Sequence, residues 1–486
     1  MSKLKKQAVN SIKWTTIKTV INSLTAPLLL IFKARYLSPT EFGVMAIINV
    51  FVSLISVLEN FGVSTAIIQR DEITKGERSS LFVFQTAFSV IIGILIILFS
   101  PIMSAIYDMN ALTSLLPILS LSVFFNAPVI LFTAFLEKEL HFKALSIIQI
   151  VREAVLVIST VILLMFDFGL LGVVLGQVAS VAVMVILVMI ESYRADLLHL
   201  YWHFKLYEIK PFIKFGIYIV AKQLMTQITH HIDELIIGYF LSAEILGLYH
   251  FAKNMLGKLR ILITTSFAKV MFPVLSKVKN DLTRLTNAYN KISKYLGIFA
   301  FPIFIGIAMT AHSFVPVLFG SEWLESTDFF VILSLSYIPY ILTANLATSL
   351  LYTVNKPNLV LFTDIIVNSV YIALLLVFSW MGLGIYYIVS LYAVYLVIKT
   401  MTLQYLTTMY LHSTFRSYLA LFKNTVIASV LMVLVVTGVN YFSTGNVSNL
   451  IELILSVIGG GLAYMVTYYF IDKKTLISMK NLALNR

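Results

Sequence analysis

Charged side chains inside long apolar stretches are the residues of this sequence best placed to do chemistry. A charge at the centre of a bilayer costs about 2.5–3.5 kcal/mol, so it usually faces protein or water. Lysine and arginine side chains can pair with phosphate groups, and intramembrane carboxylates can relay ions. The set comprises seven bases, Lys18, Arg152, Lys222, Lys253, Lys258, Arg260 and Lys399, and the acids Glu59, Glu153, Asp233, Glu234 and the shallower Asp364. This basic excess favours an anionic ligand.

Helical spacing groups many of these residues into polar stripes. Side chains at i, i+3, i+4 and i+7 share one face of a helix, and four of the apolar stretches carry such a stripe. The stripes are Thr15, Lys18, Thr19, Asn22 and Thr25; Asn49, Ser53, Ser56 and Asn60, with Glu59 alongside; Lys222, Thr226, Thr229 and Asp233, beside Gln223, Gln227, His230 and Glu234; and Lys253, Gly257, Arg260 and Thr264. We expect these four stretches to line one central cavity.

Several of these residues also have a plainer interpretation. Lys18 lies near the end of its stretch and could extend its ammonium group to the lipid headgroups. Arg152 could take part in an internal ion pair with the next residue, and Lys399 could be structural. His230 and Glu234 stand at i and i+4, as metal ligands do, but a zinc site needs a third protein ligand and the sequence shows none nearby. We therefore predict no metal site.

The elements that must position these residues are the apolar stretches themselves. Hydrophobic residues make up 59% of the chain and charged residues 12%, and the mean hydropathy is +0.93. A helix needs about 20 apolar residues to cross roughly 30 Å of hydrocarbon. Fourteen stretches reach that length: 14–34, 44–67, 80–106, 114–136, 144–166, 170–190, 212–240, 247–271, 295–319, 327–354, 359–380, 385–410, 420–441 and 450–471. The sequence predicts an all-α polytopic membrane protein with about 14 transmembrane helices.

The distribution of the 35 Lys and Arg residues predicts the topology. With the N-terminus in the cytoplasm, most of them fall in cytoplasmic loops and tails, whereas the opposite side holds only Lys33 and Arg35. Positive loop residues are retained on the cytoplasmic face, so we expect both termini in the cytoplasm. The formal net charge of +12 then follows from topology, and we predict no nucleic-acid partner.

Several classes of activity lack the residues they need. The sequence has no cysteine, which excludes thiolate catalysis, Cys-ligated metals and disulfides. It also has no HExxH motif, P-loop or Gly-rich dinucleotide loop, and no connection long enough for a nucleotide-binding domain. We predict that the protein is not an enzyme and holds no cofactor. Any energy would come from the gradient of the substrate itself or from a gradient of H⁺ or Na⁺.

A weak internal repeat predicts two lobes. Leu37-Ser38-x4-Gly43 follows the first stretch and Leu241-Ser242-x4-Gly247 follows the seventh, 204 residues later. Because six stretches separate the copies, both halves run in the same direction through the membrane, as parallel repeats do. We predict two six-helix lobes in a pseudo-twofold parallel repeat, at 1–190 and 212–410, a cytoplasmic amphipathic linker at 191–211, and two extra C-terminal helices with a tail at 411–486. Within the linker we expect a helix over 193–207 that lies on the membrane surface.

Several segments resemble a known family of membrane proteins. They are Arg35-Tyr-Leu-Ser-Pro-Thr-Glu-Phe-Gly43, Phe61-Gly-Val-Ser-Thr-Ala-Ile-Ile-Gln-Arg70, Asp233-Glu-Leu-Ile-Ile-Gly238, Leu246-Gly-Leu-Tyr249 and Phe272-Pro273. These are similar to segments of the first, second, seventh and eighth helices of Wzx-like polysaccharide and O-antigen flippases. Those proteins form the polysaccharide transporter family of the multidrug/oligosaccharidyl-lipid/polysaccharide exporter superfamily. The resemblance covers nearly the whole chain in helix number and repeat layout.

The resemblance implies a flippase that moves undecaprenyl-diphosphate-linked oligosaccharide from the cytoplasmic to the outer leaflet by alternating access. The cargo would be a repeat unit of O-antigen, capsule or exopolysaccharide. It also implies a multi-pass protein of the bacterial cytoplasmic (inner) membrane that contacts membrane lipids and works beside a glycan polymerase and a chain-length regulator. The site residues we predict are Lys18, Asn22, Arg35, Arg152, Lys222, Lys253, Lys258 and Arg260 for the cavity, and Glu59, Asp233 and Glu234 for ion coupling.

Three alternatives stay open from the sequence. A multidrug or small-molecule exporter of the related fold would suit 12 spans and an acid-dominated cavity better. A flippase of the lipid-linked peptidoglycan precursor would share the same architecture. A glycan polymerase or ligase would be expected to present a sizeable outer loop with catalytic residues, whereas the predicted outer loops are almost bare.

Overall fold

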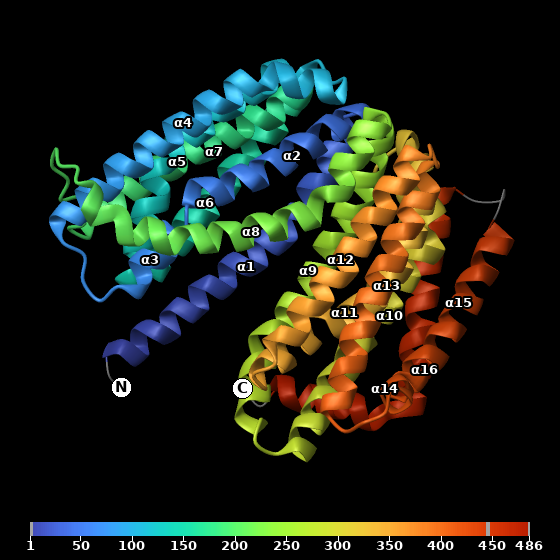
Figure 1. The fold of residues 1–486 in the computed structure, drawn as a ribbon. Coiled ribbons are helices and arrows are strands. Elements are labelled where there is room, and N and C mark those ends of the chain that lie inside the picture. The colour runs from blue at the N-terminus through green and yellow to red at the C-terminus, as the bar shows by residue number, and fades with distance from the viewer. Residues whose placement is uncertain (1–2, 444–447, 485–486) are drawn as a thin grey trace. The chain divides into compact units, whose positions relative to one another are not determined.

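The computed structural model describes residues 3–443 and 448–484 and shows a helical chain (Figure 1). Its helices are α1 (Lys3–Tyr36), α2 (Pro39–Asn60), α3 (Val63–Gln69), α4 (Lys75–Tyr107), α5 (Ala111–Lys138), α6 (Phe142–Met165), α7 (Gly169–Arg194), α8 (Leu206–Phe240), α9 (Ala243–Val278), α10 (Leu282–Leu318), the 3-10 helix η1 (Ser321–Ser326), α11 (Thr327–Thr353), α12 (Pro357–Trp380), α13 (Ile385–Tyr410), α14 (Phe415–Ala420), α15 (Lys423–Ser443) and α16 (Asn449–Leu484). No β-strand occurs in these residues, so the predicted all-α fold is confirmed.

The long helices correspond to the predicted membrane spans. Within the described ranges, twelve segments are long and apolar enough to cross a membrane, with α2 and α3 forming one segment and η1 and α11 another. Helices α8 and α9 are 35 and 36 residues long. They coincide with the seventh and eighth predicted spans. The chain is therefore a multi-pass helical membrane protein.

Local sequence explains where several helices begin and end. Ser38 and Thr74 cap α2 and α4, because each hydroxyl accepts the backbone N–H of a glutamate three residues on, and that carboxylate accepts the N–H of the cap residue. This reciprocal arrangement satisfies N–H groups that a helix start leaves without partners. Helix α2 ends at Asn60 because the next two residues, Phe61 and Gly62, have φ angles of 41° and 66°. The second predicted span, 44–67, is thus broken into α2 and α3.

Contacts between helices divide the chain into two compact units, Met1–Gly247 (unit 1) and Leu248–Arg486 (unit 2). In unit 1, α5 packs on α4 and α7, α6 packs on α7 and α1, and α8 packs on α2, α3 and α4. In unit 2, α11 packs on α10 and α13, α12 packs on α13, and α15 and α16 pack on each other and on α10. The division falls inside α9 because α8 belongs with unit 1. The lobe boundaries drawn from the repeat, 1–190 and 212–410, stay a prediction.

The connection from α7 to α8 is not helical, so the helix expected over 193–207 is wrong. Helix α7 ends at Arg194, and Asp196 takes a positive φ of 56°. Residues 195–205, which we call the strap, run instead over the first turns of α4. Three hydrogen bonds with α4 side chains hold the strap: Arg78 Nη1 to Leu197 O (2.7 Å), Tyr201 N to Ser79 Oγ (3.2 Å) and Lys205 N to Ser80 Oγ (3.1 Å). Side chains of α4 thus form hydrogen bonds with backbone groups of the strap that would pair with one another if the strap were a helix.

The two copies of the repeated motif pack against each other in unit 1. A Cβ added to Gly43 would overlap the carbonyl oxygen of Ala243, and one added to Gly247 would overlap the carbonyl oxygen of Pro39. Both sites bring helix backbones into direct contact, which a residue without a side chain permits. The glycines that mark the repeat in the sequence therefore form a reciprocal contact between α2 and the start of α9.

Candidate functional site

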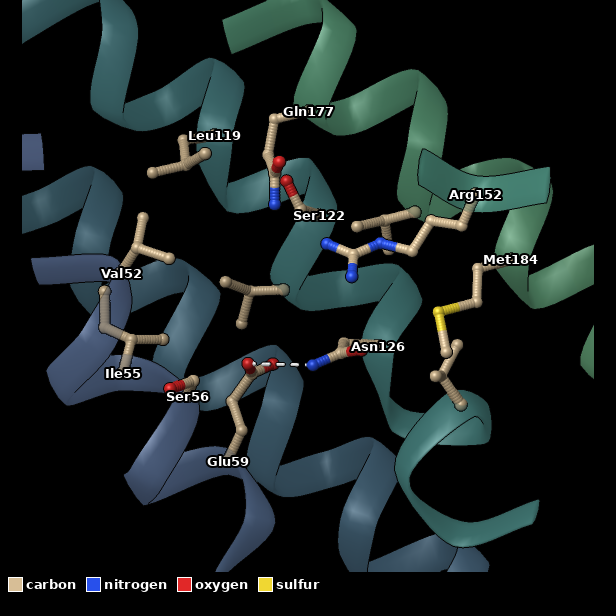
Figure 2. Close-up of a pocket in the computed structure, with 13 residues that line it drawn as sticks. Val52, Ile55, Ser56, Glu59, Leu119, Ser122, Asn126, Arg152, Gln177 and Met184 are labelled. Atoms are coloured by element: carbon tan, nitrogen blue, oxygen red, sulfur yellow. Dashed lines mark hydrogen bonds between the residues drawn. The ribbon is translucent and has the colours of Figure 1, made fainter. Parts of the chain in front are cut away.

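Unit 1 contains a partly open cavity of about 270 Å³ between α2, α5, α6 and α7 (Figure 2). Aliphatic side chains, among them Val52, Leu119 and Met184, form much of its wall. The polar side chains that line it are Ser56 and Glu59 from α2, Ser122 and Asn126 from α5, Arg152 from α6 and Gln177 from α7. The cavity therefore combines one acid, one base, two amides and two hydroxyls inside an apolar shell.

Glu59 is the acidic group of this cavity. Its side chain lies on the last turn of α2, and the residue is only 3% exposed. Asn126 donates to Glu59 Oε2 at 3.1 Å, and Gln85 donates to the Glu59 carbonyl at 2.6 Å. Within the described chain the other carboxylate oxygen, Oε1, is buried and has no hydrogen-bond partner. A buried acceptor without a donor is costly. This oxygen is therefore suited to accept a hydrogen bond from a ligand or a water, or to take up a proton.

Arg152 is the basic group, and Figure 2 shows its guanidinium directed into the same space as Asn126 and Gln177. Its Nε is buried and finds no acceptor among the described residues. The neighbouring Glu153 interacts with it electrostatically but also reaches toward α1, where Thr25 Oγ1 donates to it at 3.4 Å. The structure thus brings together two of the predicted site residues, Glu59 and Arg152, which are 93 positions apart in sequence.

Unit 2 holds two further predicted bases against tyrosine rings. Lys253 Nζ lies 5.3 Å from the ring centre of Tyr392 and 5.7 Å from that of Tyr249. The guanidinium carbon of Arg260 lies 5.0 Å from the ring centre of Tyr340. Cations over aromatic faces gain about 0.5–2 kcal/mol, so these rings hold the two bases in place. Lys258, two residues before Arg260 on the same helix, is half-buried.

Lys399 has a structural environment in unit 2. Its Nζ lies 3.0 Å from Asp364 Oδ1 and also donates to Tyr395 Oη at 3.3 Å and to Asn368 Oδ1 at 3.4 Å. The Tyr395 hydroxyl in turn donates to Asn368 at 2.9 Å. This network joins α12 to α13 and supports the structural interpretation of Lys399.

The remaining predicted site residues lie on α1 and α8 of unit 1. Lys222 is exposed, whereas Asp233 and Glu234 are 1% and 2% exposed, and His231 Nδ1 lies 3.0 Å from Glu234 Oε2. The residues of α1 comprise Lys18, which is half-buried and interacts electrostatically with Glu137, Asn22, whose Oδ1 is buried, and the exposed Arg35. The polar stripe expected on α8 therefore passes from an exposed end at Lys222 to a buried end at Asp233. Among the described residues there is no group of three or more metal-ligating side chains.

Sequence reasoning missed two amides of the cavity, Asn126 and Gln177. Each is the only amide of its apolar span, in Phe-Phe-Asn126-Ala-Pro and Leu-Gly-Gln177-Val-Ala. An isolated amide at membrane depth is a polar group that needs a partner, and that signal was available. Each span also carries a serine at helical spacing, Ser122 four residues before Asn126 and Ser180 three residues after Gln177, so a second signal was present as well.

The chain matches one family model, described as "Polysaccharide biosynthesis protein", over residues 32–328. The chain belongs to this family. The predicted resemblance to polysaccharide transporters is thereby confirmed. The relatives of this polysaccharide biosynthesis protein include two named bacterial proteins of similar identity. The lipopolysaccharide biosynthesis protein WzxC of Escherichia coli (strain K12) is 26% identical over 325 residues, which cover 66% of this chain and 65% of WzxC. The teichuronic acid biosynthesis protein TuaB of Bacillus subtilis (strain 168) is 26% identical over 345 residues, 69% of each chain. The match therefore spans about two thirds of either relative.

Solved structures show the fold that this polysaccharide biosynthesis protein shares. The lipid II flippase MurJ in an inward closed conformation superposes with a TM-score of 0.75 at 16% identity, over 96% of this chain and 100% of that chain. An inward-facing multidrug resistance transporter of the MATE family gives a TM-score of 0.54 at 12% identity, over 95% and 99%. At such identities the likeness concerns the fold, which is that of the MurJ and MATE transporters.

Proposed function

We propose that this protein is a flippase that moves undecaprenyl-diphosphate-linked oligosaccharide repeat units from the cytoplasmic to the outer leaflet by alternating access. Its membership of the polysaccharide biosynthesis protein family carries the proposal. The naming of WzxC and TuaB for lipopolysaccharide and teichuronic acid synthesis supports it, as does a fold shared with a lipid flippase. Bases such as Lys222, Lys253 and Arg260 would pair with the diphosphate.

The proposal also covers the energy source for transport, the membrane in which the protein lies and its partner proteins. The buried carboxylates Glu59, Asp233 and Glu234 are candidates for coupling transport to H⁺ or Na⁺, because intramembrane acids commonly relay ions. The excess of Lys and Arg in alternate loops supports insertion in the cytoplasmic (inner) membrane with both termini in the cytoplasm. A glycan polymerase and a chain-length regulator would receive the product, and the protein would itself catalyse no covalent step.

The test compares the source bacterium with and without this chain. We expect its loss to remove surface polysaccharide and to leave diphosphate-linked oligosaccharide on the cytoplasmic side. Rescue should succeed with the intact chain and fail with Lys222→Ala or Arg260→Ala. Lys356→Ala is the matched control, because Lys356 is an exposed lysine of the short turn between α11 and α12.

Each alternative predicts a different result of the same comparison. Unchanged surface glycan with altered drug tolerance would replace the flippase by an exporter. Accumulated lipid-linked peptidoglycan precursor with normal polysaccharide would assign the other lipid-linked cargo. Normal rescue by both variants at wild-type protein levels would remove these bases from the transport path.

A further inference from the structure

The cavity of unit 1 has polar atoms that the protein itself leaves without partners. Glu59 Oε1, Ser122 Oγ and Arg152 Nε are buried and make no hydrogen bond within the described chain. They come from three different helices, α2, α5 and α6, and their side chains line one space (Figure 2). Buried polar atoms are paired in the great majority of cases. Three unpaired atoms around one cavity therefore point to a ligand that supplies the missing donors and acceptors.

The charges of the cavity select the class of that ligand. One carboxylate and one guanidinium offset each other, so the lining has no net charge in its ionised form. A phosphate would be attracted by Arg152 but repelled by Glu59. A cation would be attracted by Glu59 but repelled by Arg152. A neutral group with several hydroxyls meets neither, because each hydroxyl both donates and accepts. It can donate to Glu59 and accept from Arg152 at the same time.

The size and the wall of the cavity agree with one sugar ring. Its volume of about 270 Å³ is slightly below the ~300–1,000 Å³ of pockets for drug-sized molecules. That space is too small for an oligosaccharide together with its diphosphate. The aliphatic side chains Val52, Val181 and Met184 would contact the C–H groups of a pyranose, while the amides of Asn126 and Gln177 add donors and acceptors at its edge.

We propose that this cavity within unit 1 is a subsite for one neutral sugar residue, held by Glu59, Arg152 and the amides around them. The inference rests on the proposed function, since the sugar would belong to the lipid-linked oligosaccharide. It adds that the glycan is sensed inside a single unit, by helices α2, α5, α6 and α7, which carry none of Lys222, Lys253 and Arg260. A glycan whose residues lack a neutral sugar would then be a poor cargo.

Single-cysteine labelling tests the subsite, because the native chain has no cysteine. Ser56→Cys places a thiol in the lining, and Ser114→Cys is the matched control outside it. Both serines are exposed, and each donates to the carbonyl three residues before it, at 2.8 Å and 3.1 Å. In purified protein in nanodiscs we expect at least one neutral monosaccharide from a panel of hexoses, deoxyhexoses and N-acetylhexosamines to slow maleimide labelling at position 56 threefold or more. Labelling at position 114 should not change.

Two further arms decide the outcome. Inorganic diphosphate should not protect position 56, and Arg152→Ala added to Ser56→Cys should abolish protection by the sugar. Absence of protection by every sugar of the panel, or equal protection by diphosphate, overturns the subsite. Flipping of lipid-linked oligosaccharide by the same single-cysteine proteins in liposomes is measured in parallel. Flipping without protection would leave the proposed function intact and remove the subsite. Protection without flipping would keep the subsite and remove the proposed function.

Discussion

Two glycine-to-alanine substitutions in the same helix should have opposite effects on stability. Gly247 and Gly257 both lie in α9. A Cβ at position 247 would fall well inside 3.0 Å of the Pro39 carbonyl oxygen and also meet the backbone of Gly43, whereas no described atom lies within 4 Å of a Cβ at position 257. The first substitution therefore adds an overlap with backbone and the second adds none.

The magnitudes follow from these surroundings. Alanine is favoured over glycine in a helix interior by roughly 0.5–1 kcal/mol, so Gly257→Ala should stabilise the protein by about that amount. At position 247 the same gain is opposed by overpacking, which costs typically 1–3 kcal/mol. Backbone atoms cannot rotate away as a side chain can, so the upper part of that range applies. We expect Gly247→Ala to destabilise the protein by about 1–2 kcal/mol.

Thermal unfolding in detergent or nanodiscs measures both substitutions, and transport of lipid-linked oligosaccharide measures the consequence for function. The free-energy difference between the two variants should be about 1.5–3 kcal/mol, from the sum of the opposite effects. We also expect Gly43→Ala to resemble Gly247→Ala, since the contact is reciprocal. Equal stability of Gly247→Ala and Gly257→Ala would refute the close contact between α2 and α9.

Three further predictions concern single side chains. Lys399→Met should lower the free energy of unfolding by about 1–3 kcal/mol. This is less than the 3–5 kcal/mol lost when one partner of a fully buried ion pair is removed, because Asp364 is 40% exposed. Denaturant unfolding that is unchanged by the substitution would contradict the network. Thr74→Ala should lower the free energy of unfolding by about 1 kcal/mol, because it removes the hydroxyl that caps α4; denaturant unfolding measures this change too. The His203 hydrogen bond lowers the pKa of Glu208 from its usual 4.5. A lowered pKa contributes stability above pH 4.5 that is lost as pH falls through the folded value. Glu208→Gln should therefore weaken the dependence of the melting temperature on pH below pH 5. If the melting temperatures of the variant and the wild type fell in parallel with pH, the contact between Glu208 and His203 would be contradicted.

The helices were predictable and their partners were not. Hydropathy located the spans because crossing a bilayer dictates length and apolarity, whatever packs beside each helix. It could not show that α2 breaks at Phe61 and Gly62, since both residues fit an apolar run and the break is visible only in their φ angles. The repeat glycines were found as a pattern, but their mutual contact depends on two helices about 200 residues apart.

The candidate site shows the same division. Glu59 and Arg152 were identified because a charge in an apolar span is conspicuous in the sequence. That they line one cavity depends on the packing of α2 and α6 around α5 and α7, which spacing within one helix cannot report. The helix expected over 193–207 was wrong for a related reason. Its amphipathic pattern was real, but hydroxyls on α4, more than 100 residues earlier, captured its backbone.

The strap leaves almost no slack between α7 and α8. Eleven residues, 195–205, would reach about 36 Å if free and extended, enough to let α8 drift from its neighbours. Hydrogen bonds to the first turns of α4, and the contacts of Glu208 with His203 and Ser80 at 3.0 Å and 2.6 Å, fix the segment along its length instead. The connection then acts as a short tether, and α8 can slide along α4 only after the strap has peeled away. Because all of those bonds must be broken before α8 can move, movement of α8 has a threshold, and a loose loop would impose none.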